Sequence, residues 1–177
     1  MIGCESVEKV GLEDVYRLYV NDIYRYLCRL TVDRVQAEDL TQETFFRAYQ
    51  YLDDYRGEKV RPWLYKAAYH TFVDWHRRRK KRPWRLVEKI PEQPDGAAAD
   101  PVRTLLSQEA WSSLRTCLDR LPEKQKQVIL LQYEQLSYAE IAEVLGIDTG
   151  DVKRSLFRGR QKLRRMWRDE LDDGQGK

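Results

Sequence analysis

The chain has 177 residues and a net charge of +3, and 34% of its residues are charged against 42% hydrophobic. This balance is typical of small helical domains with large polar surfaces and disfavours one thick globular core. The three cysteines, Cys4, Cys28 and Cys117, are odd in number and far apart, which excludes a disulfide framework and indicates a reducing, cytoplasmic location. No apolar run approaches the roughly 20 residues that span a bilayer, so we expect a soluble protein without direct membrane insertion.

Helical periodicity occupies the first part of the chain, from about residue 12 to residue 79, without hairpin signals. Breaks are expected at residues 31–35 and 53–62. In the second break Gly57 interrupts the pattern, and Pro62 suits the first turn of a new helix. The pattern predicts about three main helices, and we assign residues 1–81 to a first domain.

A proline-rich segment follows this first domain. Four of the six prolines lie between residues 82 and 101, in a composition that lacks the apolar pattern of a packed element. We expect a linker at residues 82–104 and a second domain at residues 105–171, with about four helices over residues 105–121, 122–133, 137–145 and 149–168. Residues 172–177 are expected to be disordered. The predicted fold class is all-α, with two small helical domains joined by a flexible linker.

The second domain contains the pattern of a helix-turn-helix. Ser137 and Glu140 have the spacing of a capping box at the start of a helix. Gly146 then suits the turn, and Thr149 and Asp151 can cap the next helix or stabilise it by charge. In a helix-turn-helix the second helix enters the major groove of DNA.

At 100° per residue, the second helix of this pair separates an apolar face from a basic face. The inner face carries Val152, Leu156, Gly159, Leu163 and Met166. The outer face carries Lys153, Arg154, Phe157, Arg158, Gln161 and Arg165. Arginine and lysine can reach guanine or phosphate, and a ring can pack against a thymine methyl, so Lys153, Arg154, Phe157 and Arg158 are candidates for binding duplex DNA. Arg160 is added as a fifth candidate because it belongs to the motif at residues 152–160 that is described below. Two alternatives stay open: a solvated face with Phe157 packed on a neighbouring helix, and a helix for a membrane surface.

A second exposed face is expected on the helix over residues 35–52. One side carries Ala37, Leu40, Thr44, Ala48 and Tyr51, which we expect in the core. The opposite side is acidic and rich in amides, and its members are Asp39, Gln42, Glu43, Phe46 and Gln50. An aromatic ring among exposed polar groups is typical of a protein-binding anchor. The alternative is that Phe46 is covered by its own domain.

The helix over residues 62–79 presents a basic face with aromatic residues. Leu64, Ala68, Thr71, Phe72 and Trp75 are expected in the core, while Lys66, His70, Val73 and Arg77 are displayed and Trp63 lies at the edge. Arg56, Lys59 and Arg61 precede this helix, and a basic run over residues 77–82 follows it. Cations beside rings suit single-stranded or distorted DNA. The candidates are Arg56, Lys59, Arg61, Trp63, Lys66, His70 and Arg77, although Trp63 and Trp75 could equally belong to the core.

Catalytic and metal sites have no counterpart in the sequence. His70 and His76 are six residues apart, so they lie on different faces of a helix and have no third ligand nearby. We find no Ser/His/Asp set and no phosphate-binding glycine loop. We therefore expect no metal, no cofactor, no small-molecule substrate and no enzymatic activity.

These motifs together resemble the extracytoplasmic-function (ECF) group of bacterial sigma factors. Residues 39–45 (DLTQETF) are similar to the family's motif for the β' clamp helices of RNA polymerase. Residues 55–58 (YRGE) and 63–68 (WLYKAA), with Asp74, Arg77 and Arg78, resemble its promoter-melting and minus-ten segment. Residues 121–123 (LPE), 136–142 (LSYAEIA) and 152–160 (VKRSLFRGR) resemble the domain that reads the minus-thirty-five element.

The resemblance implies a sigma factor that binds core polymerase at the β' clamp helices and the β flap, binds promoter DNA, and is held inactive by an anti-sigma factor. Within it, Asp39, Gln42 and Glu43 contact polymerase and the basic helix after the turn contacts duplex DNA. Two positions depart from the family: Asp151 stands where threonine is usual, and His70 where asparagine is common. The residue patterns alone also allow two other functions. One is a dimeric operator-binding regulator, and the other is an adaptor or anti-terminator that reads no promoter.

Overall fold

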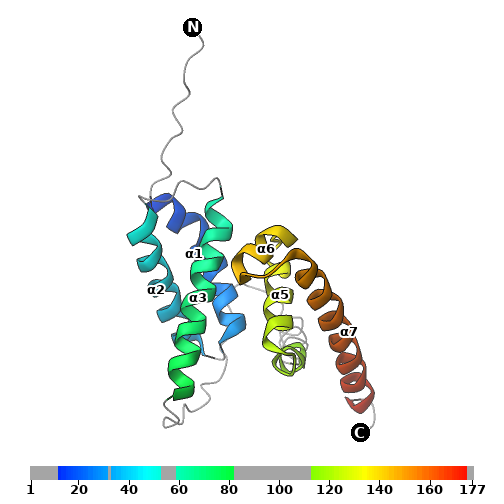
Figure 1. Cartoon of the computed structure of the whole chain (residues 1–177). Helices are drawn as coiled ribbons and strands as arrows, with labels where there is room; N and C mark the ends of the chain where they lie inside the picture. The colour runs from blue at the N-terminus through cyan, green and yellow to red at the C-terminus, as the bar shows by residue number, and fades with distance from the viewer. Residues whose placement is uncertain (1–11, 32, 53–58, 82–112, 175–177) are drawn as a thin grey trace. The chain divides into compact units, whose positions relative to one another are not determined.

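The structure is a computed structural model that describes residues 12–31, 33–52, 59–81 and 113–174. The chain divides into two compact units, Met1–Pro83 and Trp84–Lys177. Figure 1 shows helices α1 to α3 in the first unit and α5 to α7 in the second. Every regular element in the described residues is helical, which confirms the all-α fold class. The expected linker at residues 82–104 lies outside the described residues.

The first unit consists of α1 (Leu12–Leu30), α2 (Arg34–Leu52) and α3 (Val60–Lys81), and each of the three packs against the other two (Figure 1). The expected three helices are present, and Pro62 lies in the first turn of α3, where a missing N–H costs nothing. The core takes one apolar face from each helix. Its most buried members include Ile23, Tyr26, Leu27, Ala37, Leu64, Tyr65 and Ala68.

Two edge-to-face pairs of aromatic rings connect the helices of this core. Phe45 of α2 meets Tyr16 of α1 edge-on at a centroid distance of 4.9 Å, and Tyr26 of α1 meets Tyr65 of α3 at 5.3 Å, the geometry that ring quadrupoles favour. The prediction that Tyr51 belongs to the core is wrong, because its residue is 62% exposed. Tyr51 has the right helical phase but lies in the last turn of α2, where neighbouring side chains do not cover it.

Threonine hydroxyls are buried between the helices of this unit. Thr41 donates to the carbonyl of Ala37 at 2.7 Å, and Thr44 donates to the carbonyl of Leu40 at 2.6 Å. Both hydroxyls are therefore satisfied within α2 itself. Thr71 of α3 is 2% exposed, and its Oγ1 has no hydrogen-bond partner among the described residues.

The second unit contains a helix at residues 113–119 and then α5 (Glu123–Tyr133), α6 (Tyr138–Leu145) and α7 (Thr149–Gly174). The predicted capping box is confirmed: the Oγ of Ser137 accepts from the Glu140 amide at 3.3 Å, and Glu140 Oε2 accepts from the Ser137 amide at 2.8 Å. Gly146 ends α6 with φ 64°, a left-handed conformation that glycine adopts without steric cost. This turn leads directly into α7.

Helix α7 begins at the expected residue, but its capping residue and its C-terminal end differ from the sequence expectation. The side chain that caps its start is Asp148, whose Oδ1 accepts from the Asp151 amide at 2.8 Å, whereas Thr149 is already the first helical residue. The helix continues to Gly174 and so includes three residues of the segment 172–177 that was expected to be disordered. The physical reason is that no glycine or proline stands between Gly159 and Gly174 to end the helix earlier.

Gly159 lets α7 approach α5 closely. A Cβ added at this glycine would lie 2.7 Å from Ile129 Cδ1 and 3.3 Å from Gln125 Cβ. Val152 and Leu156 of the same face are buried, at 0% and 3% exposure. The inner face predicted for α7 is thus confirmed at these residues, and its orientation decides which side chains α7 presents outward.

Candidate nucleic-acid and protein interfaces

The outer face of α2 carries the candidate protein-binding residues. Asp39, Gln42 and Glu43 are exposed, and Phe46 is 60% exposed. The described residues therefore do not cover the ring of Phe46, which favours the protein-binding interpretation over packing inside its own domain. Burying a ring of this kind against a partner removes a large apolar area from water. The four side chains form an acidic surface with one aromatic anchor, which we call the α2 outer face.

Arg47 connects the α2 outer face to α3. Its Nε donates to Glu43 Oε1 at 2.7 Å and its Nη1 donates to Asp74 Oδ2 at 3.1 Å. These hydrogen bonds, first the one to Glu43 and then the one to Asp74, raise the pKa of Arg47 further above its ordinary value. Trp75 Nε1 also donates to Gln36 Oε1 at 2.6 Å. Polar contacts thus fix α2 against α3 beside the shared core.

A pocket of about 280 Å³ lies between α2 and α3. It is lined by Arg47, Ala48, Tyr51, Trp63, Lys66, Ala67 and His70. Three of the residues predicted to bind DNA, Trp63, Lys66 and His70, therefore meet at one cavity. Rings on its walls can stack on a planar ligand, and Lys66 supplies positive charge for phosphate, whereas Arg47 is already paired with Glu43 and Asp74. The volume lies just below the range of about 300–1,000 Å³ typical of small-ligand sites, which suits a single ring.

The other cations predicted in this unit do not line the pocket. Lys59 and Arg77 are exposed, and the guanidinium of Arg61 lies 5.6 Å from the ring centre of Tyr65. Arg56 lies outside the described residues. Trp75 is half-buried, with Arg79 placed 5.3 Å over its ring. Trp75 is therefore neither a full core residue nor a freely displayed one.

The outer face of α7 is basic throughout. Lys153, Arg154, Arg158 and Arg160 are exposed, and Phe157 is 64% exposed. The described residues leave the ring of Phe157 open, so packing on a neighbouring helix does not account for it. Because the inner face of α7 is held against α5 and α6, this outer face is the surface that α7 offers to a macromolecule.

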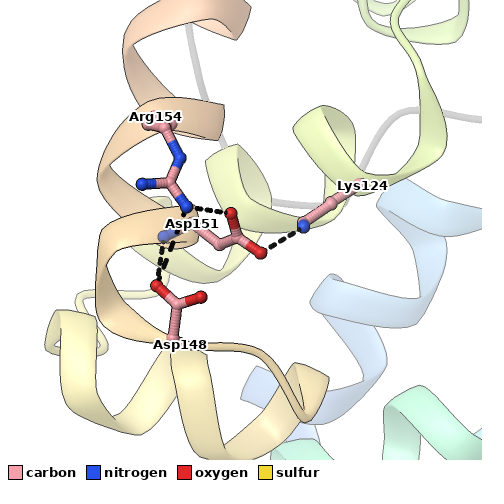
Figure 2. A network of polar contacts seen from close by, with 4 residues as sticks. All are labelled: Lys124, Asp148, Asp151 and Arg154. Carbon is pink, nitrogen blue, oxygen red and sulfur yellow. Dashed lines mark hydrogen bonds and ion pairs between the residues drawn. The ribbon is translucent and has the colours of Figure 1, made fainter.

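The start of α7 carries a network of four charged side chains, shown in Figure 2. Asp151 Oδ1 accepts from Arg154 Nη2, Asp151 Oδ2 accepts from Lys124 Nζ of α5 at 2.9 Å, and Asp148 Oδ1 lies 3.9 Å from Arg154 Nη2. The bond from Lys124 and then that from Arg154 hold the pKa of Asp151 below its usual range. Asp151 in turn raises the pKa of Arg154. Figure 2 shows the side chains of Lys124 and Arg154 on either side of Asp151.

Several of these residues were missing from the sequence candidates. Arg47 could have been found from its spacing of four residues from Glu43, a helical ion-pair spacing. Asp148 could have been found as a preferred capping residue just before a helix. Lys124 and Tyr51 gave no local signal, because their roles depend on which helices pack together.

Among the described residues, no group of three or more histidine, cysteine, aspartate or glutamate side chains gathers in a way that could hold a metal ion. None of the helices in the described part of the chain is both long enough and apolar enough to cross a membrane.

Comparison with protein families gives two matches along the chain. Sigma-70 region 2 matches residues 15–82, and Sigma-70 region 4 matches residues 111–163. Among individual relatives, the ECF RNA polymerase sigma factor SigM of Bacillus subtilis is 32% identical over 163 residues, which cover 92% of this chain and 98% of that protein. The ECF RNA polymerase sigma factor SigW of Bacillus subtilis is 34% identical over 167 residues and covers 88% of each chain.

Solved structures show the same fold. The sigma factor RpoE, crystallised with the anti-sigma factor NepR from Bartonella quintana, matches with a TM-score of 0.72 and 19% identity, over 90% of this chain and 98% of that one. CnrH, solved with the cytosolic domain of CnrY, matches with a TM-score of 0.66 and 20% identity, over 93% and 92% of the chains. The family matches and the close relatives agree with the motifs of the sequence. The chain belongs to the ECF sigma factors of the sigma-70 family.

Proposed function

We propose that the chain directs promoter-specific transcription initiation by dividing three binding tasks among three exposed surfaces. The observation that carries this proposal is the separation of an acidic α2 outer face, a pocket between α2 and α3 lined by aromatic side chains and Lys66, and a basic outer face on α7. Asp39, Gln42, Glu43 and Phe46 bind core RNA polymerase at the β' clamp helices. Phe46 supplies the anchor of that contact, because its large exposed ring becomes buried against the partner on binding.

The first domain, residues 1–81, captures the minus-ten element. Trp63, Lys66 and His70 line the pocket, and an unstacked base of the non-template strand enters there while Arg56, Lys59, Arg61 and Arg77 hold its phosphates. Extruding a base costs a few kcal/mol, and stacking on a protein ring returns about 1–3 kcal/mol per base. Strand opening is therefore driven by binding energy rather than by a chemical step.

The second domain, residues 105–171, anchors the upstream duplex at the minus-thirty-five element. Lys153, Arg154, Phe157, Arg158 and Arg160 face the major groove from α7, while α5 and α6 support that helix from behind. The linker, residues 82–104, sets the distance between the two DNA sites, and the domain also contacts the β flap of polymerase.

An anti-sigma factor regulates the protein by covering these surfaces. The structural relatives support this part, since RpoE was solved with the anti-sigma factor NepR. Such a partner would find the exposed ring of Phe46 and the cations of α7 available together in the free protein. The protein works in the cytoplasm without a catalytic site, a cofactor or a small-molecule substrate.

Run-off transcription with core RNA polymerase tests the proposal. Promoters are selected from random DNA with reconstituted holoenzyme and transcribed with and without the protein. Transcripts that start at one position and require the protein support a sigma factor. Tight duplex binding without polymerase would indicate an operator-binding regulator instead, and polymerase binding without promoter choice would indicate an adaptor.

A further inference from the structure

Arg154 stands apart from the other outward cations of α7. Its Nη2 donates to Asp151, which also holds Lys124 of the neighbouring helix α5 at 2.9 Å (Figure 2). Among the described residues, no ion pair holds Lys153 or Arg158. The guanidinium of Arg154 is therefore placed before DNA arrives, whereas those two side chains remain free to follow a phosphate.

The network also determines what Asp151 itself can bind. Each of its carboxylate oxygens already accepts a hydrogen bond from a cation, Oδ1 from Arg154 and Oδ2 from Lys124. Two of the roughly four acceptor positions of this carboxylate are therefore taken by cations of the protein itself. Arg154 keeps unused donors, since its bonds to described residues all go through Nη2 and a guanidinium has five N–H groups in a rigid fork. Asp151 therefore acts through Arg154 rather than on DNA directly.

Charge balance points the same way. The two negative charges of Asp148 and Asp151 balance the two positive charges of Arg154 and Lys124, so these four side chains carry no net charge. A neutral group attracts phosphate weakly, which leaves Arg154 better suited to a base edge than to the backbone. Exposed ion pairs add little to fold stability, and the side chains of Arg154 and Asp151 are 60% and 33% exposed. Orientation, not stability, is what this pairing supplies.

The backbone beneath Arg154 is shaped to fit the network. A Cβ added to Gly150 would lie 2.9 Å from Asp148 Oδ1 and 3.3 Å from Arg154 Nη1. The absence of a side chain in the first turn of α7 therefore leaves the space that the folded-back guanidinium occupies. Glycine lowers the stability of a helix. At this position its missing side chain leaves room for the contacts among Asp148, Asp151 and Arg154.

We propose that Asp151 is a positioning residue that presents Arg154 to one guanine of the upstream duplex and thereby sets base preference at one position. This inference rests on the proposed function of α7 as the helix that reads duplex DNA. Arginine pairs with guanine through two hydrogen bonds to O6 and N7, and a guanidinium held in advance loses less conformational entropy on forming them. Without Asp151, the side chain becomes one more mobile phosphate contact.

Base preference measured in the holoenzyme tests the inference. The full chain is assembled with core RNA polymerase and mixed with duplex fragments that keep one minus-ten region and carry a randomised upstream element. Bound fragments are sequenced at several salt concentrations. Arg154→Ala defines the position that Arg154 reads, because preference for guanine should fall there by about 5-fold or more. Asp151→Ala should reduce the preference for guanine at the same position by about 3- to 10-fold. It should also steepen the slope of the logarithm of the binding constant against the logarithm of salt concentration by about one unit for each cation that it frees to bind phosphate.

Three further variants separate orientation from charge. Asp151→Asn keeps an oxygen acceptor, so it should reduce the preference for guanine at the position read by Arg154 less than Asp151→Ala does. Gly150→Ala removes no charge and should still reduce the preference for guanine at that position, because the new Cβ crowds Asp148 Oδ1 and Arg154 Nη1. In the Arg154→Ala background, Asp151→Ala should change no base preference. A uniform change of affinity in Asp151→Ala with all base preferences intact would overturn the inference, as would a wild-type profile in Gly150→Ala.

Arg158→Ala distinguishes failure of this inference from failure of the proposed function. If Arg158→Ala weakens binding to the upstream duplex while Asp151→Ala leaves base preference unchanged, α7 reads DNA and only the positioning role is wrong. If Arg158→Ala and Arg154→Ala both bind like the wild type, α7 is not the reading helix and both conclusions fail. Circular dichroism of each variant checks that α7 remains folded.

Discussion

Two buried threonines of the first unit should respond in opposite directions to the same substitution. Thr44 and Thr71 are both buried, at 0% and 2% exposure, and valine has nearly the same shape and helix propensity as threonine. Thr44 donates to the carbonyl of Leu40 at 2.6 Å, whereas the hydroxyl of Thr71 has no partner among the described residues. The pair therefore isolates the effect of satisfying a buried hydroxyl.

The expected magnitudes follow from the hydrogen-bond partners. An unsatisfied buried hydroxyl costs about 1–3 kcal/mol, so Thr71→Val should raise the free energy of unfolding by about 1 kcal/mol or more. A satisfied hydroxyl contributes a net 0.5–1.5 kcal/mol or so, so Thr44→Val should lower the free energy of unfolding by about 1 kcal/mol. The two variants should thus differ by about 2 kcal/mol.

Urea denaturation of the full chain measures this difference. Amide NMR signals from α1, α2 and α3 report on the first unit alone, which matters because a chain with two units need not unfold in one step. The dependence on urea concentration should be the same in both variants and the wild type, since the surface exposed on unfolding does not change. A Thr71→Val protein that loses as much stability as Thr44→Val would show that the hydroxyl of Thr71 is satisfied, and would refute the reasoning.

Other predictions concern the interfaces and the second unit. Asp39→Arg should abolish association with core RNA polymerase in a pull-down while circular dichroism stays unchanged, because the residue is exposed on α2; normal association would count against the α2 outer face. Arg158→Ala should weaken binding to the upstream duplex by about 1–3 kcal/mol if it reads a base, and an unaltered footprint there would remove that role. Ser137→Ala should lower the stability of the second unit by about 0.5–1 kcal/mol in urea denaturation, since its bond to the Glu140 amide is long at 3.3 Å; no change would mean that the Glu140 carboxylate caps α6 alone. Gly159→Leu should cost about 1–3 kcal/mol by overpacking against Ile129, which lies 2.7 Å from the added Cβ, and Ile129→Ala in the same protein should recover part of this loss; two strictly additive effects would argue against direct contact.

Periodicity predicted most of the fold because each helix buries one face. Ala37, Leu40, Leu64 and Ala68 are buried as expected. The same rule missed Phe45 and Tyr65, with 6% and 0% exposure. Each of the helices α2 and α3 contacts two others, so the buried arc is wider than a single stripe, and a sequence pattern does not show how wide it is.

The candidate site was predictable where one helix forms it alone. The outer face of α7 follows from the positions of its buried residues, and the five DNA-binding candidates on it are exposed; their contacts with DNA stay a prediction. The pocket of the first unit was not predictable in full, because Arg47 and Tyr51 come from α2 while Trp63 and Lys66 come from α3. Pairing of Lys124 with Asp151 likewise depends on how α5 packs beside α7.

The length of α7 has a consequence for how quickly the protein finds DNA. Its 26 residues extend about 39 Å, whereas the major groove is about 12 Å wide. If α7 reads duplex DNA as proposed, the groove accommodates only its first few turns, and exposed cations continue beyond them at Lys162, Arg164, Arg165 and Arg168. These charges attract the duplex from a distance and favour sliding along it, and this guidance fades as ionic strength rises. On the proposed function, recognition and search occupy successive stretches of one helix, and we expect that the search rate can change without altering which sequence is preferred.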